Sequence, residues 1–305
     1  MGMGMGMGMS GRVDPPVRTG TCRLPDGRAL GWSEWGPPDG APVLLCPGAA
    51  TGSRLGFGTD LVDTLGVRLV SADRPGLGAS DPAPGRTLDD WARDVRHLAA
   101  ERGLGRPALV GYSQGAPFAL ACAAHGLASA VAVVSGTDEL ASPRFADALE
   151  PEVRHLVDLA VADPEAAEAL FAGFGSADVL WEVIAAGSSG TDLAVYRQPS
   201  FETALRGALA DGFARGPAGY ARDTLLAMGR WPFAPADVAV PVDLWYGRQD
   251  TSPTHSPDLG AGLAALLPDA RRHLVPGAGG ALLWTRAEPV LRSLLERGGA
   301  PLTRC

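Results

Sequence analysis

A serine flanked by glycines in the stretch GYSQG, residues 111–115, is the first candidate for chemistry in this chain. A serine hydroxyl is a weak nucleophile until a neighbouring base accepts its proton. The stretch follows the apolar run PALV (107–110) and precedes the helical pattern APFALACAA (116–124). Glycines on both sides let the backbone turn sharply and let the helix approach the strand closely. The pattern predicts that Ser113 is a nucleophile on a strand-to-helix turn; the alternative is a serine that caps the helix.

Six short apolar runs, each followed by a loop and a helical pattern, predict the sheet that must position this serine. The runs are near-continuous rather than alternating in polarity, which is typical of parallel strands covered on both faces. Strands that alternate with helices favour an α/β fold with a mostly parallel sheet. A hairpin turning at 25–27 precedes them, and helices are predicted over 87–103, with Thr87 as N-cap, and over 285–298. The six runs are 42–46, 67–73, 107–112, 129–136, 240–247 and 271–277.

Between residues 138 and 236 this alternation stops, and the patterns are helical. An insertion after the nucleophile strand lies over the carboxyl ends of the strands, where open α/β sheets bind ligands. We therefore expect a helical lid at 138–236, between two parts of one core at 18–137 and 237–305. The alternative is that these helices only cover hydrophobic surface. Residues 1–17, which begin with alternating methionine and glycine, are predicted to be disordered.

The composition is that of an ordinary globular chain, with 305 residues, a formal net charge of −8 and 46% hydrophobic residues. The acidic balance without a basic cluster argues against nucleic acid as a partner. No run reaches the roughly 20 apolar residues of a membrane span. The four cysteines lack paired or metal-binding spacing, so a cytoplasmic location is expected. The sequence shows no metal or nucleotide motif, and no cofactor is predicted.

With these motifs in place, the chain resembles a lid-bearing α/β-hydrolase of the serine-nucleophile type over about residues 18–298. The likeness is carried by GYSQG, by SADRPGLGASD (71–81) and by LWYGRQD (244–250). In that family the nucleophile, the acid and the histidine follow in this order along the chain. The resemblance implies that Ser113 is the nucleophile and Asp250 the acid that orients a histidine. From its residue type and surroundings alone, Asp250 can also be a loop-capping aspartate.

The resemblance also implies an oxyanion hole made of two backbone N–H groups. One belongs to the residue after the nucleophile, Gln114. The other comes from the loop after the first parallel strand, which here reads CPGAATGS (46–53). Pro47 stands where relatives usually carry histidine and has no N–H, so the second donor is expected at Ala49.

The histidine of the resembled family is missing from its usual place. That place is the loop after the last strand, VPGAGGALLW (275–284), where the position falls on Gly280. We therefore predict that the nucleophile lacks the usual hydrogen bond to a histidine. His255, on the loop that carries the predicted acid, is the leading candidate for a substitute base, and His155 in the helical insertion is the second. The remaining histidines are interpreted as structural: His97, His125 and His273.

Three classes of function remain open from the sequence. The first is an enzyme that acts on an ester, thioester or lactone carbonyl through Ser113, with an atypical or missing histidine base. The second is a non-hydrolytic enzyme of the same fold, a cyclase, lyase or isomerase of secondary metabolism, and the third is a ligand-binding pseudoenzyme. Ser113 and Asp250 favour an enzyme. The apolar lid predicts a hydrophobic small-molecule substrate, with these aromatic residues as lid core or pocket walls: Trp181, Tyr196, Phe201, Phe213, Tyr220, Trp231 and Phe233.

Overall fold

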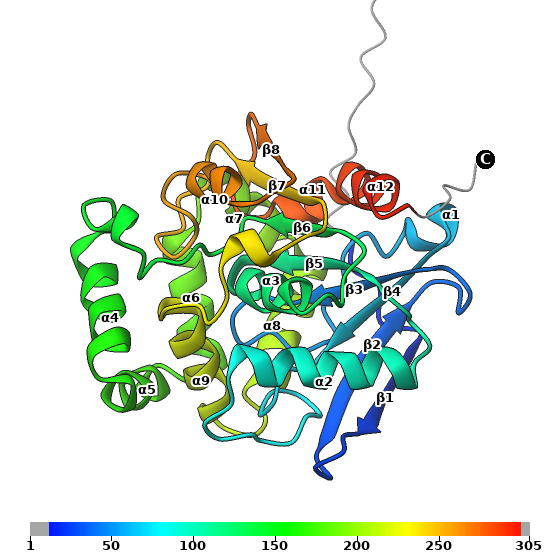
Figure 1. Ribbon diagram of the computed structural model, residues 1–305, viewed down its shortest axis with the longest axis horizontal. Coiled ribbons are helices and arrows are strands. Elements are labelled where there is room, and N and C mark those ends of the chain that lie inside the picture. The colour runs from blue at the N-terminus through cyan, green and yellow to red at the C-terminus, as the bar shows by residue number, and fades with distance from the viewer. Residues whose placement is uncertain (1–11, 300–305) are drawn as a thin grey trace, which may run out of the picture.

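The computed structural model describes residues 12–299, and its centre is one eight-stranded sheet in the order β1-β2-β4-β3-β5-β6-β7-β8 (Figure 1). The pairs β1–β2 and β2–β4 are antiparallel, whereas every pair from β4 to β8 in this order is parallel. This confirms the predicted α/β fold. The strands are β1 (Arg18–Arg23), β2 (Ala29–Trp35), β3 (Ala41–Cys46), β4 (Val67–Ala72), β5 (Ala108–Tyr112), β6 (Val131–Val134), β7 (Val242–Gly247) and β8 (Ala270–Val275).

Helices cover both faces of the sheet, which explains why the parallel strands are apolar without alternation. One face packs against α2 (Leu88–Glu101), α3 (Ala116–Ala124) and α10 (Ala261–Leu266). The other face packs against α1 (Val62–Leu65), α11 (Leu282–Thr285) and α12 (Ala287–Arg297). Successive side chains of a strand point to opposite faces, so both sets of side chains lie in apolar layers.

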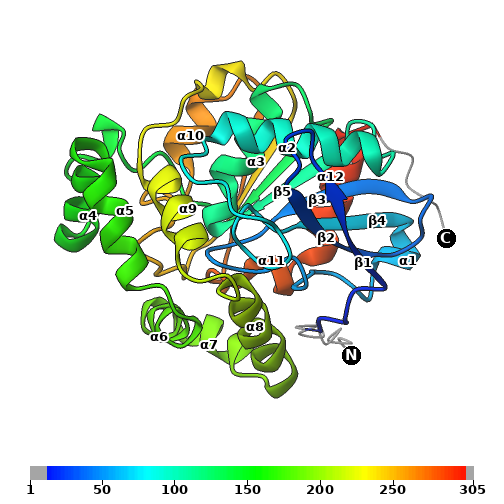
Figure 2. The same cartoon turned by 90° about the horizontal axis from the view of Figure 1, so that it is seen from below.

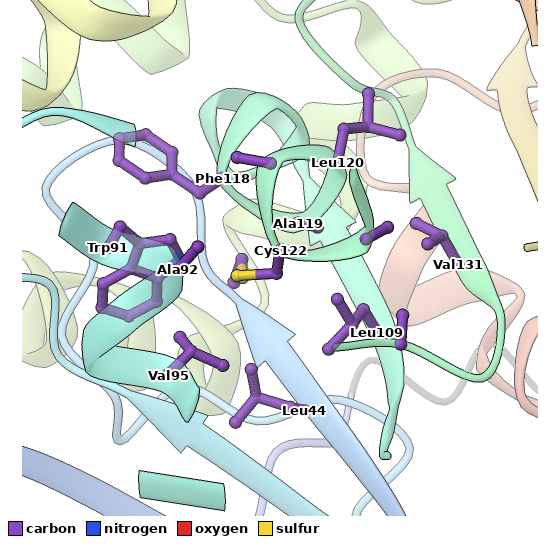
Figure 3. Close-up of a cluster of buried hydrophobic side chains, with 14 of the residues drawn as sticks. Leu44, Trp91, Ala92, Val95, Leu109, Phe118, Ala119, Leu120, Cys122 and Val131 are labelled. Carbon is purple, nitrogen blue, oxygen red and sulfur yellow. The ribbon is translucent and has the colours of Figure 1, made fainter. Parts of the chain in front are cut away.

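Figure 3 shows the first of these layers, in which aromatic side chains of the helices lie over leucines of the strands. Trp91 of α2 and Phe118 of α3 meet edge to face, with their ring centroids 6.2 Å apart. Cys122 is fully buried in the same layer, as expected of a small apolar residue. Helix α2 starts as predicted, because the Thr87 side chain accepts a hydrogen bond from the backbone N–H of Asp90.

The chain between β6 and β7, all of which the structure describes, contains six α-helices and no strand. Figure 2 shows these helices gathered beside the sheet rather than over its two faces. Helix α9 reaches the end of β5, where the Gln114 side chain donates to the Thr224 hydroxyl over 3.0 Å. The six helices are α4 (Pro151–Ala162), α5 (Pro164–Gly173), α6 (Ala177–Gly187), α7 (Gly190–Tyr196), α8 (Pro199–Gly212) and α9 (Ala218–Met228).

Among the described helices, none is both long and apolar enough to cross a membrane by itself. Helices α5 and α6 reach the necessary length and composition only when taken together, and they are bent by 95° at the break between them.

The segment that precedes β1 corrects one prediction. Residues 1–11 of the segment predicted to be disordered lie outside the described residues. Residues 12–17, in contrast, are held against the sheet: the Asp14 N–H donates to Thr59 Oγ1 over 2.9 Å, and Trp35 Nε1 donates to the Asp14 carbonyl over 2.9 Å. The prediction is therefore wrong around Asp14, whose backbone N–H and carbonyl groups find partners that the local sequence does not show.

Candidate active site

Ser113 lies on a sharp turn at the carboxyl end of β5. Its φ of +50° is in the left-handed region, which non-glycine residues rarely adopt. The flanking glycines are required by space: a Cβ at Gly111 would lie 2.7 Å from the Ala116 Cα, and one at Gly115 would lie 2.0 Å from the Cys46 carbonyl oxygen. A strained, sterically enforced turn of this kind points to a functional position rather than to simple helix capping.

His255 and Asp250 form a continuous hydrogen-bonded chain with Ser113. His255 Nε2 lies 2.8 Å from Ser113 Oγ, and His255 Nδ1 lies 2.8 Å from Asp250 Oδ2 and 3.0 Å from Oδ1. A carboxylate can only accept, so Nδ1 carries the proton and the Nε2 lone pair faces the serine hydroxyl. The side chains of Asp250 and His255 are only 2% and 9% exposed. This is the arrangement of a serine nucleophile with an oriented base.

The expectation that Ser113 lacks a histidine partner is therefore wrong. Gly280 has no imidazole, as the sequence shows, but the space beside it is occupied by the His255 ring. A Cβ at Gly280 would lie 3.3 Å from His255 Cε1 and 3.2 Å from Asp250 Oδ1. The loop after β7 thus delivers the ring to the place at which the loop after β8 was expected to deliver it. Sequence alignment by strand order cannot reveal this exchange.

The other histidines lie elsewhere. His155 is exposed on α4, and among the described residues the cavity beside Ser113 has no histidine in its lining except His255. His97 Nε2 lies 2.9 Å from the Arg23 carbonyl oxygen, and His125 Nε2 lies 2.8 Å from Asp89 Oδ1. His273 stacks on Trp245 with the ring centroids 3.9 Å apart. These contacts agree with their interpretation as structural residues.

The two residues predicted to supply oxyanion donors lie beside Ser113. Ala49 and Gln114 line the same cavity as Ser113. The loop that carries Ala49 closely approaches the turn that carries Ser113, since a Cβ at Gly48 would lie 3.7 Å from Ser113 Cβ. The Gln114 side chain donates a hydrogen bond to the Thr224 hydroxyl over 3.0 Å, so the side-chain amide is already engaged with α9. Two backbone N–H groups that point at a carbonyl oxygen stabilise the negative charge that develops on it, so the placement of Ala49 and Gln114 keeps this prediction open.

The loop after β8 is fixed by groups that sequence reasoning missed. Asp192 of α7 accepts the Ala281 N–H over 2.8 Å, and the Tyr112 hydroxyl donates to the Gly280 carbonyl over 3.1 Å. Because the Tyr112 proton is used there, Tyr196 must donate in the 3.0 Å hydrogen bond between the two hydroxyls. Burial raises the pKa of Tyr112 well above its usual value, so it remains a donor. No local motif marks these residues, because their partners are far apart in sequence.

A cavity of about 200 Å³ opens onto Ser113 and has mostly apolar walls. Helices α6 to α9 supply one side of it, and the loops after the strands supply the other. Of the aromatic residues predicted as lid core or pocket walls, Tyr196 and Tyr220 line the cavity, and Tyr196 also belongs to the buried core cluster that contains Trp181 and Phe201. The apolar contributors from the helices are Leu180, Val183, Ile184, Leu205, Ala227 and Met228.

Comparisons with known proteins agree with this architecture. The sequence model described as the Alpha/beta hydrolase family matches residues 43–296. A non-heme chloroperoxidase from Streptomyces lividans is 33% identical over 99 residues, which are 32% of this chain and 36% of that protein. The chain thus matches about a third of the length of this curated relative.

Solved structures match over most of the chain. An esterase from Rhodococcus sp. is 20% identical, with 92% of this chain and 98% of that chain covered and a TM-score of 0.62. An enol-lactonase from Burkholderia xenovorans is 18% identical, with 91% and 98% covered and a TM-score of 0.66. At these identities the likeness shows a shared fold.

Proposed function

Because this chain belongs to the alpha/beta hydrolase family, we propose that it hydrolyses esters or lactones of small hydrophobic molecules, with Ser113 as the nucleophile. His255 is then the general base, and Asp250 orients it. The observation that carries this proposal is the unbroken chain of hydrogen bonds from Asp250 through His255 to Ser113 at the wall of an apolar cavity. The structurally similar esterase and enol-lactonase support esters or lactones as the class of substrate.

The proposed reaction follows from the directions of these hydrogen bonds. Ser113 Oγ attacks the substrate carbonyl while His255 Nε2 accepts its proton, and Asp250 stabilises the imidazolium that results. The N–H groups of Ala49 and Gln114 receive the oxyanion of the tetrahedral intermediate. His255 then returns the proton to the leaving alcohol, and an acyl group remains on Ser113. Water, deprotonated by the same histidine, releases the acid and restores the serine.

The volume and the lining of the cavity support a particular class of substrate. A volume of about 200 Å³ is smaller than the usual 300–1,000 Å³ of sites for drug-sized ligands, which favours a compact acyl or alcohol group. The walls from α6 to α9 are mostly aliphatic and aromatic, which favours apolar substituents. We propose that the helical segment 138–236 acts as a lid that shields the acyl-enzyme from bulk water.

The non-hydrolytic and pseudoenzyme alternatives lose their main support, which was the absence of a base near the nucleophile. The chloroperoxidase match covers only a third of each chain, so the proposal rests on the geometry instead.

Hydrolysis of p-nitrophenyl acetate and p-nitrophenyl butyrate by the wild type and Ser113→Ala tests the proposal. We expect clear turnover by the wild type and a fall in kcat of about 10⁵-fold or more in the variant. Equal rates in the two proteins would contradict a role for Ser113. Turnover of butyrate but not of a bulky naphthoate ester would support the compact cavity.

A further inference from the structure

We propose that Arg74, together with helix α9, is a positioning device that aims the oxyanion donors at the substrate carbonyl. This inference rests on the proposed function. It concerns the motif SADRPGLGASD (71–81), whose arginine has no part in the reaction steps above. Arg74 is 1% exposed, and it contacts the loop 46–53, which carries Ala49 and is called the oxyanion loop. Arg74 does not line the cavity beside Ser113.

The Arg74 guanidinium holds two successive carbonyl groups of the oxyanion loop. Nη1 donates to the Pro47 carbonyl over 2.6 Å, and Nη2 donates to the Gly48 carbonyl over 2.8 Å. A planar guanidinium with several donors is the side chain best suited to fix two acceptors at once. The loop is therefore oriented by a buried cation as well as by its own backbone.

Peptide geometry transmits this orientation to the donor. The Gly48 carbonyl and the Ala49 N–H belong to one planar trans peptide, so they point in opposite directions. Holding the Gly48 oxygen toward Arg74 directs the Ala49 N–H away from Arg74, and Ala49 lines the cavity on Ser113's side. A cation on the carbonyl end also polarises the peptide, which makes its N–H a stronger donor.

Helix α9 fixes Arg74 from the opposite side. Arg74 Nε donates to Asp223 Oδ2 over 2.6 Å, and Asp223 is fully buried. Asp223 also forms an ion pair with Arg86, which donates to the Gly219 carbonyl over 3.2 Å. The guanidinium groups of Arg74 and Arg86 share the Asp223 carboxylate, and these ion pairs fix the position of Arg74 relative to α9.

The next residue of α9 supports the second donor. Thr224 accepts a hydrogen bond from the Gln114 side chain over 3.0 Å while its own hydroxyl donates to the Tyr220 carbonyl over 2.9 Å. Asp223 and Thr224, adjacent in one helix, thus tether the loop of Ala49 and the residue Gln114. A helix of the segment 138–236 therefore serves the catalytic core as well as the cavity wall.

The first test compares Arg74→Lys with the wild type in kcat, KM and inhibition by phenylboronic acid, which forms a tetrahedral adduct on a reactive serine. We expect kcat to fall about 10²-fold, the value of one oxyanion donor, while KM changes less than about threefold. Phenylboronic acid should bind more weakly by a similar factor. Arg28→Lys is the matched control, because Arg28 forms a part-buried pair with Asp94 at 2.9 and 3.0 Å elsewhere in the fold, and it should leave these values unchanged.

Two further variants keep the proposal open to refutation if Arg74→Lys does not fold. Asp223→Asn keeps the shape but weakens the hold on Arg74, and Thr224→Val removes the tether of Gln114. Each should lower kcat about 10-fold with little change in KM. A folded Arg74→Lys or Asp223→Asn with wild-type kcat, or with a raised KM alone, overturns this inference. Absence of Ser113-dependent turnover in the wild type overturns the proposed function and this inference with it, so the two failures are distinct.

Discussion

The loops after β7 and β8 meet beside Ser113, but they differ in what they supply. The loop after β7 carries both Asp250 and His255, whose side chains are in direct hydrogen-bonded contact. The loop after β8 carries Gly280, and a Cβ there would lie 3.3 Å from the His255 ring. The comparison shows that one imidazole lies beside Ser113 and that the loop after β7, not the loop after β8, supplies it. Under the proposed function, the position of the imidazole in space matters more than the strand that precedes it.

The same comparison shows how each loop is stabilised. The loop after β7 is tied to the end of α6, where Thr251 Oγ1 donates to the Gly187 carbonyl over 2.9 Å. The loop after β8 is tied to α7, where Asp192 accepts the Ala281 N–H. Both loops are therefore held by the helical segment 138–236, although only the loop after β7 places ionisable side chains next to Ser113.

Removal of the His255 imidazole tests the comparison of the two loops, and of the variants in these two loops it should lower kcat the most. We expect His255→Ala to lower kcat for p-nitrophenyl butyrate by about 10⁵- to 10⁶-fold, since serine then has no base. His155→Ala is the matched control: it removes an exposed histidine of α4 and should retain wild-type activity. A loss confined to His155→Ala would reverse the roles of the two residues.

Replacement of the acid tests whether the loop after β7 works as a unit. Asp250→Asn keeps the shape but favours the wrong imidazole tautomer, so kcat should fall about 10⁴-fold. The measurement is the same ester assay, with the melting temperature as a check on folding. A fall of less than about 10-fold would show that His255 is oriented by other groups.

Transfer of the imidazole to the loop after β8 tests whether position in space is decisive. In the double variant His255→Ala/Gly280→His, the deleted ring leaves room for a new side chain beside Asp250. We expect about 10²-fold more activity than in His255→Ala alone, the contribution of a positioned general base. If the double variant is no better than the single one, the loop after β8 cannot present a base in this fold.

A small displacement of the His255 imidazole by a neighbouring methyl group should lower kcat the least. Gly280→Ala places a methyl group 3.2–3.3 Å from Asp250 and His255, and the small displacement should lower kcat about 10-fold. Gly207→Ala is the control, because a Cβ at this exposed helical glycine meets nothing within 4 Å. It should leave kcat unchanged and stabilise the protein by up to about 1 kcal/mol. Equal kcat in both variants would mean that the ring tolerates displacement.

Much of the fold is predictable from the sequence because its signals are local. Continuous apolar runs indicated the parallel strands, and the glycines around Ser113 indicated the turn, since backbone contacts there leave no space for a Cβ. The sequence singled out His255 as the leading substitute base because it lies on the loop of Asp250, but it favoured a nucleophile without a histidine and could not show the contact with Ser113. His255 is 142 positions away in the chain, and only the folded loop after β7 brings its Nε2 within 2.8 Å of Ser113 Oγ. The roles of Asp192 and Arg74 likewise depend on contacts between distant segments.

Labelling of Ser113 by a fluorophosphonate, located by peptide mass spectrometry, tests the central claim most directly because it needs no knowledge of the substrate. The account predicts a single adduct on Ser113 in the wild type and in His155→Ala. In His255→Ala the labelling rate should fall at least about 10³-fold, since the hydroxyl has lost its base. Labelling of Ser113 at the same rate with and without His255 would contradict the account.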